Sequence, residues 1–342
     1  MQAYNQGLEQ DQNFGAMYVG MARARLQSDP NANVLALLDE AIRLDPNFGE
    51  AYLERGAVKL RDNDLQGAVN DLGNANKYLP NSPLVFYDLA QTRYKEGQFD
   101  LALSAAQRAK ELDVTILPNY LLLGQIYVET GNTDGAIEAL QTYIKYKPDD
   151  VPASVLFGTL LYDLGKYDQT IQMMDRVIRL ERTRREAYLY RFLSNVELGN
   201  GEAADADVKA VQSFYSNLFE FNLGLVRTHV LNERYGSAES ILDKTKTLAE
   251  TDKQKALIYY WAALVYEKRN NPKKAAENWK LLLDLPPEAM TADMRKQAEE
   301  QLLTLVTPTS SPTPTKTRTA TPTKKVTPTR TPTRTPTPTP TT

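Results

Sequence analysis

The chain of 342 residues contains no cysteine and a single histidine, His229. Without cysteine there can be no disulfides, no thiolate nucleophile and no zinc site with sulfur ligands. One histidine leaves the usual catalytic triads and histidine-based metal sites almost without side chains. We also find no glycine-rich phosphate loop, nucleophile elbow or zinc motif. The sequence therefore predicts a protein that is not an enzyme and that uses no cofactor and no metal.

Long apolar runs are also missing. No stretch approaches the roughly 18–20 apolar residues of a transmembrane helix, although 42% of the residues are hydrophobic. The chain starts with MQAYNQGLEQDQ, which has neither the basic start nor the apolar run of a signal peptide. We expect no transmembrane segment. The expected location is cytoplasmic if the chain is complete, and the cell surface or extracellular space if a leader was trimmed.

Acidic residues are absent from the C-terminal segment, residues 307–342, which contains six cations. Because the whole chain has a net charge of −3, residues 1–306 have a net charge of −9. Thr and Pro alternate in this segment with almost no apolar side chains, so it cannot bury enough surface to fold. We expect a disordered, basic, Thr/Pro-rich tail. It could be a spacer, a glycosylated stalk of a surface protein, or an anion-binding segment, and the sparse charges favour the spacer.

What the chain does contain is a period of 34 residues. A small residue recurs in most steps of a series that starts at Ala22 and then runs through Gly56, Ala90, Gly124 and Gly158. A second small-residue series starts at Val34, and an aromatic series starts at Tyr18. Turn glycines lie between the two small-residue series. Each unit therefore reads as two short amphipathic helices joined by a tight turn, with the small residues where helices cross closely.

This pattern resembles the tetratricopeptide repeat in unit length, in the aromatic near the start, in the small eighth residue and in the proline near the end. The resemblance implies an all-α, right-handed superhelical solenoid. We expect a cap or remnant at 1–14, eight repeats within 15–289 and a capping helix at 290–306. The eight units are 15–48, 49–82, 83–116, 117–150, 151–184, 185–218, 219–255 and 256–289. The sixth and seventh units depart from the pattern at Phe192, Asn222 and Val226.

The resemblance also implies a function: a non-catalytic scaffold or adaptor that binds a peptide or protein segment in the concave groove. The groove residues that it implies, many of them apolar or tyrosine, are Leu53, Leu60, Tyr87, Tyr94, Gln125, Val128, Glu129, Tyr162, Asp163, Leu189, Glu197 and Tyr260. Alternatively, some of these side chains pack against neighbouring helices and do not line the groove.

Two other functions stay open at this point. A surface or secreted repeat protein would use the Thr/Pro-rich segment as a stalk. An RNA-binding helical-repeat protein would have units of similar length, but the acidic body counts against it, so we expect no nucleic acid. Oligomeric state and partner identity are left open.

Charge adds one hypothesis about the partner. Glu129, Asp163 and Glu197 occupy the thirteenth position of three successive units and should form an acidic stripe. The fourth to sixth units place no cation in the expected groove. A partner with basic and apolar residues would suit this part.

Overall fold

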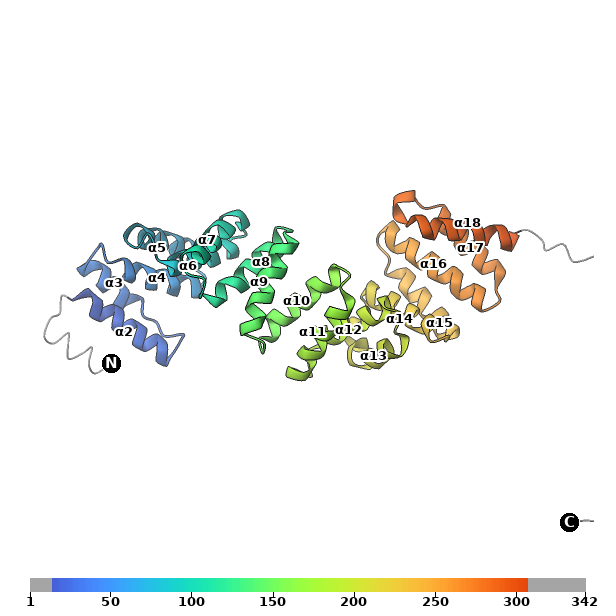
Figure 1. Cartoon of the computed structure of the whole chain (residues 1–342), viewed down its shortest axis with the longest axis horizontal. Coiled ribbons are helices and arrows are strands. Elements are labelled where there is room, and N and C mark those ends of the chain that lie inside the picture. Colours follow the sequence, from blue (N-terminus) through green and yellow to red (C-terminus); the bar gives the residue numbers. More distant parts are fainter. Residues whose placement is uncertain (1–13, 307–342) are drawn as a thin grey trace, which may run out of the picture.

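The computed structural model describes residues 14–306, which form an elongated series of antiparallel helix pairs (Figure 1). These residues contain 17 α-helices, one short 3-10 helix and no strand. The expected tail and all but the last residue of the expected N-terminal segment lie outside the described residues. The helices are α2 Gly15–Ser28, α3 Leu35–Leu44, α4 Gly49–Arg61, α5 Leu65–Tyr78, α6 Pro83–Lys95, α7 Phe99–Leu112, α8 Leu117–Glu129, α9 Thr133–Tyr146, α10 Val151–Asp163, α11 Tyr167–Leu180, α12 Arg185–Glu197, α13 Gly201–Tyr215, α14 Phe219–Leu231, α15 Tyr235–Thr247, α16 Asp252–Lys268, α17 Pro272–Leu283, η1 Pro287–Ala289 and α18 Ala292–Val306.

The 34-residue period reappears in the helix starts. The first helices of the pairs, α2 to α14 in even numbers, begin every 34 residues, and α16 begins one residue early. The turn inside a unit needs a left-handed residue, which glycine adopts at no steric cost. Gly97 has φ 72°, and Asn63 takes the same place in the preceding unit with φ 64°. The structure is the all-α solenoid that the sequence predicts.

Close contact within a unit explains the small residue at the eighth position. A Cβ on Gly56 would lie 2.8 Å from Cγ of Leu72, and one on Gly124 would lie 2.6 Å from Cγ of Leu140. Both leucines come from the second helix of the same unit and are completely buried. The glycines therefore lower helix propensity but let the second helix approach, and the contact recovers dispersion energy.

In the sixth unit a large side chain takes the small-residue position, and a glycine of the next unit faces it. Phe192 takes the small-residue position and is completely buried. The space for its ring comes from Gly224 of α14, where a Cβ would lie 2.7 Å from Phe192 Cε1. Phe221 packs beside it, with the two ring centroids 5.3 Å apart. The large residue is thus matched by a glycine in the next unit.

Two arginines, Arg55 and Arg191, each join neighbouring helices through a bidentate ion pair. Arg55 of α4 donates to both carboxylate oxygens of Asp71 in α5 at 2.6 and 2.8 Å and also to Asp39 of α3 at 2.7 Å. Arg191 of α12 donates to Asp207 of α13 at 2.6 and 2.9 Å. Asp71 and Asp207 are buried, and the bidentate arginine in each case supplies the hydrogen bonds and the opposite charge that offset the loss of water.

The last helix, α18, packs on α17 at the end of the series. Its Ala298 is completely buried in a cluster with Trp279 of α17 and Ala263 of α16. Among the described residues, no helix is both long enough and apolar enough to span a membrane.

Candidate functional site

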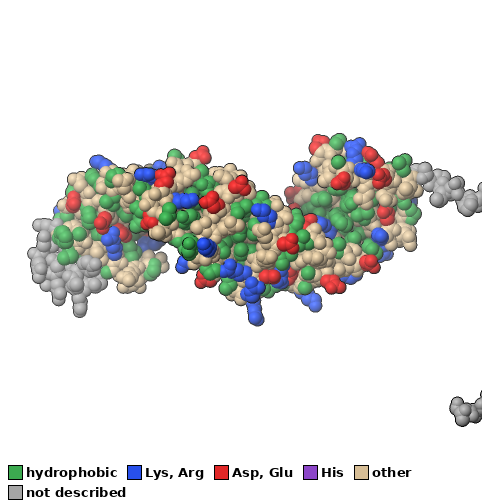
Figure 2. Space-filling model, viewed as in Figure 1, with side chains coloured by type: hydrophobic (Ala, Val, Ile, Leu, Met, Phe, Trp, Pro, Cys, Tyr) green, Lys and Arg blue, Asp and Glu red, His purple; other side chains and the backbone are tan. Residues whose placement is uncertain are grey.

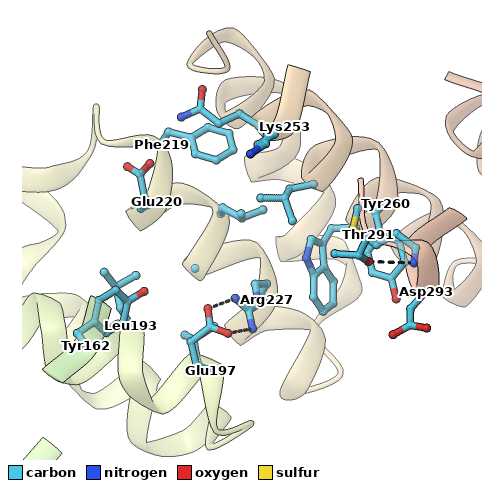
Figure 3. A pocket seen from close by; sticks show the side chains of 17 residues that line it. Tyr162, Leu193, Glu197, Phe219, Glu220, Arg227, Lys253, Tyr260, Thr291 and Asp293 are labelled. Atoms are coloured by element: carbon cyan, nitrogen blue, oxygen red, sulfur yellow. Dashed lines mark hydrogen bonds and ion pairs between the residues drawn. The ribbon is translucent and has the colours of Figure 1, made fainter. Parts of the chain in front are cut away.

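A hollow of about 570 Å³ lies in the C-terminal half of the solenoid. Four successive first helices, α10, α12, α14 and α16, line it together with the start of α18 (Figure 3). These helices come from four units that are adjacent in the series. The hollow is therefore a product of the stacking and is not present in any single repeat.

Most of the wall is apolar. The side chains that give it this character are Phe219, Leu223, Leu257, Trp261 and Met294. Figure 2 shows hydrophobic side chains gathered on this face of the C-terminal part, with charged side chains around them. A hollow with apolar walls and a charged rim suits an inserted hydrophobic side chain whose backbone remains near water.

An ion pair lines one side of the hollow. Arg227 of α14 donates from both terminal nitrogens to the carboxylate of Glu197 in α12, one of these bonds measuring 3.0 Å. The guanidinium carbon also lies 5.5 Å from the ring centroid of Trp261. Arg227 thus joins three units and presents its charge beside an aromatic face.

Tyr260 forms another part of the wall and is held in place on several sides. Its hydroxyl donates to Gln297 Oε1 of α18 at 2.7 Å. Its ring packs edge-on against Trp261 and Trp279, each at 5.6 Å between centroids. Tyr260 therefore fixes α18 against α16, and these contacts define the shape of this side of the hollow.

The structure brings some of the sequence-predicted groove residues together and leaves others apart. Tyr162, Glu197 and Tyr260 all line the hollow. The remaining polar or exposed candidates do not line it, and they lie on α6, α8 and α10: Tyr87, Tyr94, Gln125, Val128, Glu129 and Asp163. Among them, Val128 is exposed and Tyr87 accepts a hydrogen bond from Gln91 at 2.5 Å.

Three predicted groove residues are buried instead of exposed. Leu53, Leu60 and Leu189 are 8%, 5% and 5% exposed and belong to core clusters. They occupy the same repeat positions as Tyr87 and Tyr94, which are only partly buried. A leucine is short enough to be covered by the next helix, whereas a tyrosine ring reaches beyond it. We therefore correct the set of groove residues by removing these three leucines.

The acidic stripe also needs correction. Glu197 is not a free anion, because Arg227 neutralises it. Two other carboxylates, those of Asp163 and Glu220, have no ion-pair partner among residues 14–306. Burial and the negative charge of nearby groups, including these two carboxylates, raise the pKa of Tyr190. Of the three predicted stripe residues, only Glu197 is neutralised, whereas Glu129 and Asp163 have no ion-pair partner among residues 14–306.

Sequence reasoning missed Arg227 and Trp261. Arg227 is the ninth residue of the seventh unit, a groove position in the resemblance, so carrying the register through that atypical unit would have revealed it. Trp261 follows the predicted Tyr260 directly. Nothing in the sequence indicates that Glu197 and Arg227 pair, because they are 30 residues apart.

One carboxyl on the N-terminal side is unusual. Asp88 of α6 is largely buried, and burial together with the charge of Glu54 raises its pKa to about 7. No hydrogen bond or ion pair from its carboxylate is found within residues 14–306. In the same part of the chain no group of His, Asp and Glu side chains could hold a metal ion.

Comparison with known proteins agrees with this architecture. The tetratricopeptide repeat family matches residues 87–151. A comparison with curated proteins found no match. Among solved structures, PilF of Pseudomonas aeruginosa is similar over 60% of this chain and 94% of its own, with 14% identity and a TM-score of 0.52.

Two further solved structures are similar at lower TM-scores. A tetratricopeptide repeat protein from Parabacteroides merdae has 17% identity and a TM-score of 0.47, covering 75% of this chain and 98% of its own. YrrB, described as having an unusual peptide-binding site, has 22% identity and a TM-score of 0.46, covering 54% of this chain and 95% of its own. The family match over residues 87–151 and the series of stacked helix pairs show that the chain contains tetratricopeptide repeats.

Proposed function

We propose that the protein is a non-catalytic scaffold that binds a protein segment in the groove formed by its first helices. Proteins built from tetratricopeptide repeats generally act in this way, and the YrrB structure is described as having a peptide-binding site. The observation that carries the proposal is the apolar hollow shared by four successive units. Aromatic anchors that enter such pockets commonly supply most of the binding energy.

We also propose the domain organisation that the repeat period suggests. Residues 15–289 are eight repeats, residues 290–306 are a cap, and residues 1–14 and 307–342 are terminal segments. The 34-residue spacing of the helix starts supports the repeat boundaries. The cap is supported by the packing of α18, which buries Ala298 and bonds to Tyr260 through Gln297.

The chemistry of the hollow favours a partner with apolar and basic residues. Leu257 and Trp261 offer an apolar surface for a large side chain. Glu220 and Asp293 line the hollow and have no ion-pair partner among the described residues, so each can pair with a Lys or Arg of the partner. Because exposed charges are screened beyond about 8 Å at physiological salt, the ionic part of the binding should weaken with salt and the apolar part should persist.

Peptide selection tests this function. A random library of 12-residue peptides is selected on the full chain and counter-selected on a Leu257→Glu variant, which places a charge in the apolar wall. The expected winners combine Lys or Arg with large apolar residues and bind the variant at least tenfold more weakly, a loss of about 1.4 kcal/mol. A Tyr146→Ala variant is the matched control, since Tyr146 is exposed and does not line the hollow.

One outcome of this selection contradicts the proposal. If the selected peptides bind the parent and Leu257→Glu with the same affinity, while both proteins have the same helix content, the hollow is not the binding site.

A further inference from the structure

A cluster of arginines lies away from the hollow. Five arginines fall within residues 176–185. This concentration of positive charge contrasts with the net charge of −9 of residues 1–306. The five are Arg176, Arg179, Arg182, Arg184 and Arg185, called here the arginine surface. None of them lines the hollow described above. Figure 2 shows Lys and Arg side chains projecting at the lower edge of the molecule, where Figure 1 places α11.

The repeat architecture does not require these arginines. Position 32 of a unit is often proline, as at Pro80 and Pro148, and the fifth unit has Arg182 there. Position 26 is Asn74 in the second unit, Arg108 in the third and Arg176 in the fifth, and position 29 is basic in the first, second, fourth and fifth units. Single basic residues therefore recur along the solenoid, but five arginines within ten residues occur in the fifth unit and the start of the sixth. The stacking of the repeats does not account for this density.

The arginines remain available for a partner. Within residues 14–306, Arg176, Arg179 and Arg182 have no hydrogen-bonded or ionic side-chain partner. Arg179 and Arg182 are exposed. Only Arg184 has an ionic contact, at 3.3 Å from Glu186. The region thus combines several unneutralised guanidinium groups, each of which can bind a carboxylate through two parallel N–H bonds.

The local backbone and two apolar side chains give this surface a defined form. The turn between α11 and α12 is closed by a bond from Arg184 N to the carbonyl of Glu181 at 3.1 Å. Arg185 stacks on the exposed ring of Phe214, with its guanidinium carbon 3.4 Å from the ring centroid. Leu180 is 48% exposed in the same segment. Cations and apolar groups are therefore presented side by side.

We propose that the arginine surface is a second binding site, separate from the groove, for a short acidic protein segment that also carries apolar residues. Charge complementarity selects carboxylates, and Leu180 and Phe214 supply apolar contacts. The site lets one molecule of the protein hold two different segments at once, one in the groove and one on this surface.

A short acidic segment fits better than a long polyanion. Nucleic acid or an anionic bilayer would extend beyond the five arginines and meet a body of net charge −9, which repels it. An acidic segment of a few residues contacts only the arginines. Since charge effects decay within about 8 Å at physiological salt, the distant carboxylates hardly affect it.

A titration of the full chain with labelled peptides tests this site. The probe is a 15-residue peptide of Glu and Leu, and its matched control has Gln in place of Glu. Combined reversal Arg176→Glu, Arg179→Glu and Arg182→Glu should weaken binding of the Glu peptide about tenfold or more, because three favourable charge pairs become repulsive. Reversal of three exposed lysines elsewhere, Lys244→Glu, Lys273→Glu and Lys280→Glu, changes the net charge equally and should change the affinity less than about twofold.

The other measurements separate this site from the groove and from other partners. Leu257→Glu should leave binding of the Glu peptide unchanged, so failure of the groove proposal does not affect this result. Replacing the three arginines by lysine should give intermediate binding, since charge is kept but the bidentate fork is lost. The proposal is overturned if the lysine reversal weakens binding as much as the arginine reversal. It is also overturned if only polyuridylate RNA or phosphatidylserine vesicles bind in an arginine-dependent manner.

Discussion

The close contact at the eighth repeat position makes a quantitative prediction for Gly124→Leu. A Cβ there would lie 2.6 and 2.7 Å from Cγ and Cδ2 of Leu140, about 1 Å inside an ordinary carbon contact. Leu140 is completely buried and cannot turn toward water. Overpacking of this kind costs about 1–3 kcal/mol, and a whole leucine side chain belongs at the upper end.

The helix propensity acts in the other direction and must be subtracted. Replacing glycine by leucine inside a helix gains roughly 1 kcal/mol. The net destabilisation is therefore about 2 kcal/mol, which lowers the melting temperature of a protein of this size by about 3 °C. Because each repeat contacts mainly its neighbours, hydrogen exchange should increase first in α8 and α9.

A matched glycine provides the control. Gly73 lies inside α5, and a Cβ at this position would meet no atom within 4 Å. Gly73→Leu should therefore gain the propensity term of roughly 1 kcal/mol and raise the melting temperature. Combining Gly124→Leu with Leu140→Ala should recover part of the loss, since space is returned to the same contact. The packing argument is refuted if Gly124→Leu melts like the parent or if both glycine variants lose the same stability.

Three further predictions concern other parts of the molecule. Truncation after Val306 should leave helix content and melting temperature unchanged, because a Thr/Pro-rich segment forms no core, and a clear drop in melting temperature would contradict this. Asp71→Ala should destabilise the protein by about 3 kcal/mol, measured by urea unfolding, because it leaves the guanidinium of Arg55 without its main partner. Asp88 has a folded-state pKa of about 7, above its ordinary value, so the folded state binds more protons and the parent loses stability as the pH rises from about 4 to 7. Asp88→Asn should remove this loss and be more stable than the parent at pH 8 but not at pH 4, which melting curves at the two pH values check.

The helix pairs could be predicted because their signal is periodic. A small residue and a turn glycine recur at a fixed interval, and only a stack of identical supersecondary units requires both. The role of Gly56 followed from the same reasoning, since a glycine inside a helix needs a packing cause. Such local rules depend on the order of residues within one unit, and the sequence displays that order directly.

The groove could be predicted only in part because it depends on neighbouring units. Leu53 and Tyr87 occupy equivalent positions, yet the first is buried and the second partly exposed, since side-chain length decides which one the next helix covers. The pairing of Glu197 with Arg227 joins the sixth unit to the seventh, where the repeat pattern is weakest. Phe192 and Gly224 compensate each other across the same junction. Long-range complementarity of this kind is not visible in a single unit.

The two tryptophans allow the most direct test of binding in the groove. Trp261 lines the hollow, whereas Trp279 is completely buried and donates its indole N–H to Glu267 at 2.6 Å. The chain has no other tryptophan. In a 15N spectrum the two indole signals therefore report the groove and the core separately.

The measurement is a titration of the 15N-labelled full chain with a Lys/Leu peptide and with a matched Glu/Leu peptide. The Lys/Leu peptide should shift the Trp261 indole signal in a saturable manner and leave the Trp279 signal in place, and the Glu/Leu peptide should move neither. If the Lys/Leu peptide binds while the Trp261 signal does not move, the bound segment lies elsewhere and the proposed groove function is wrong.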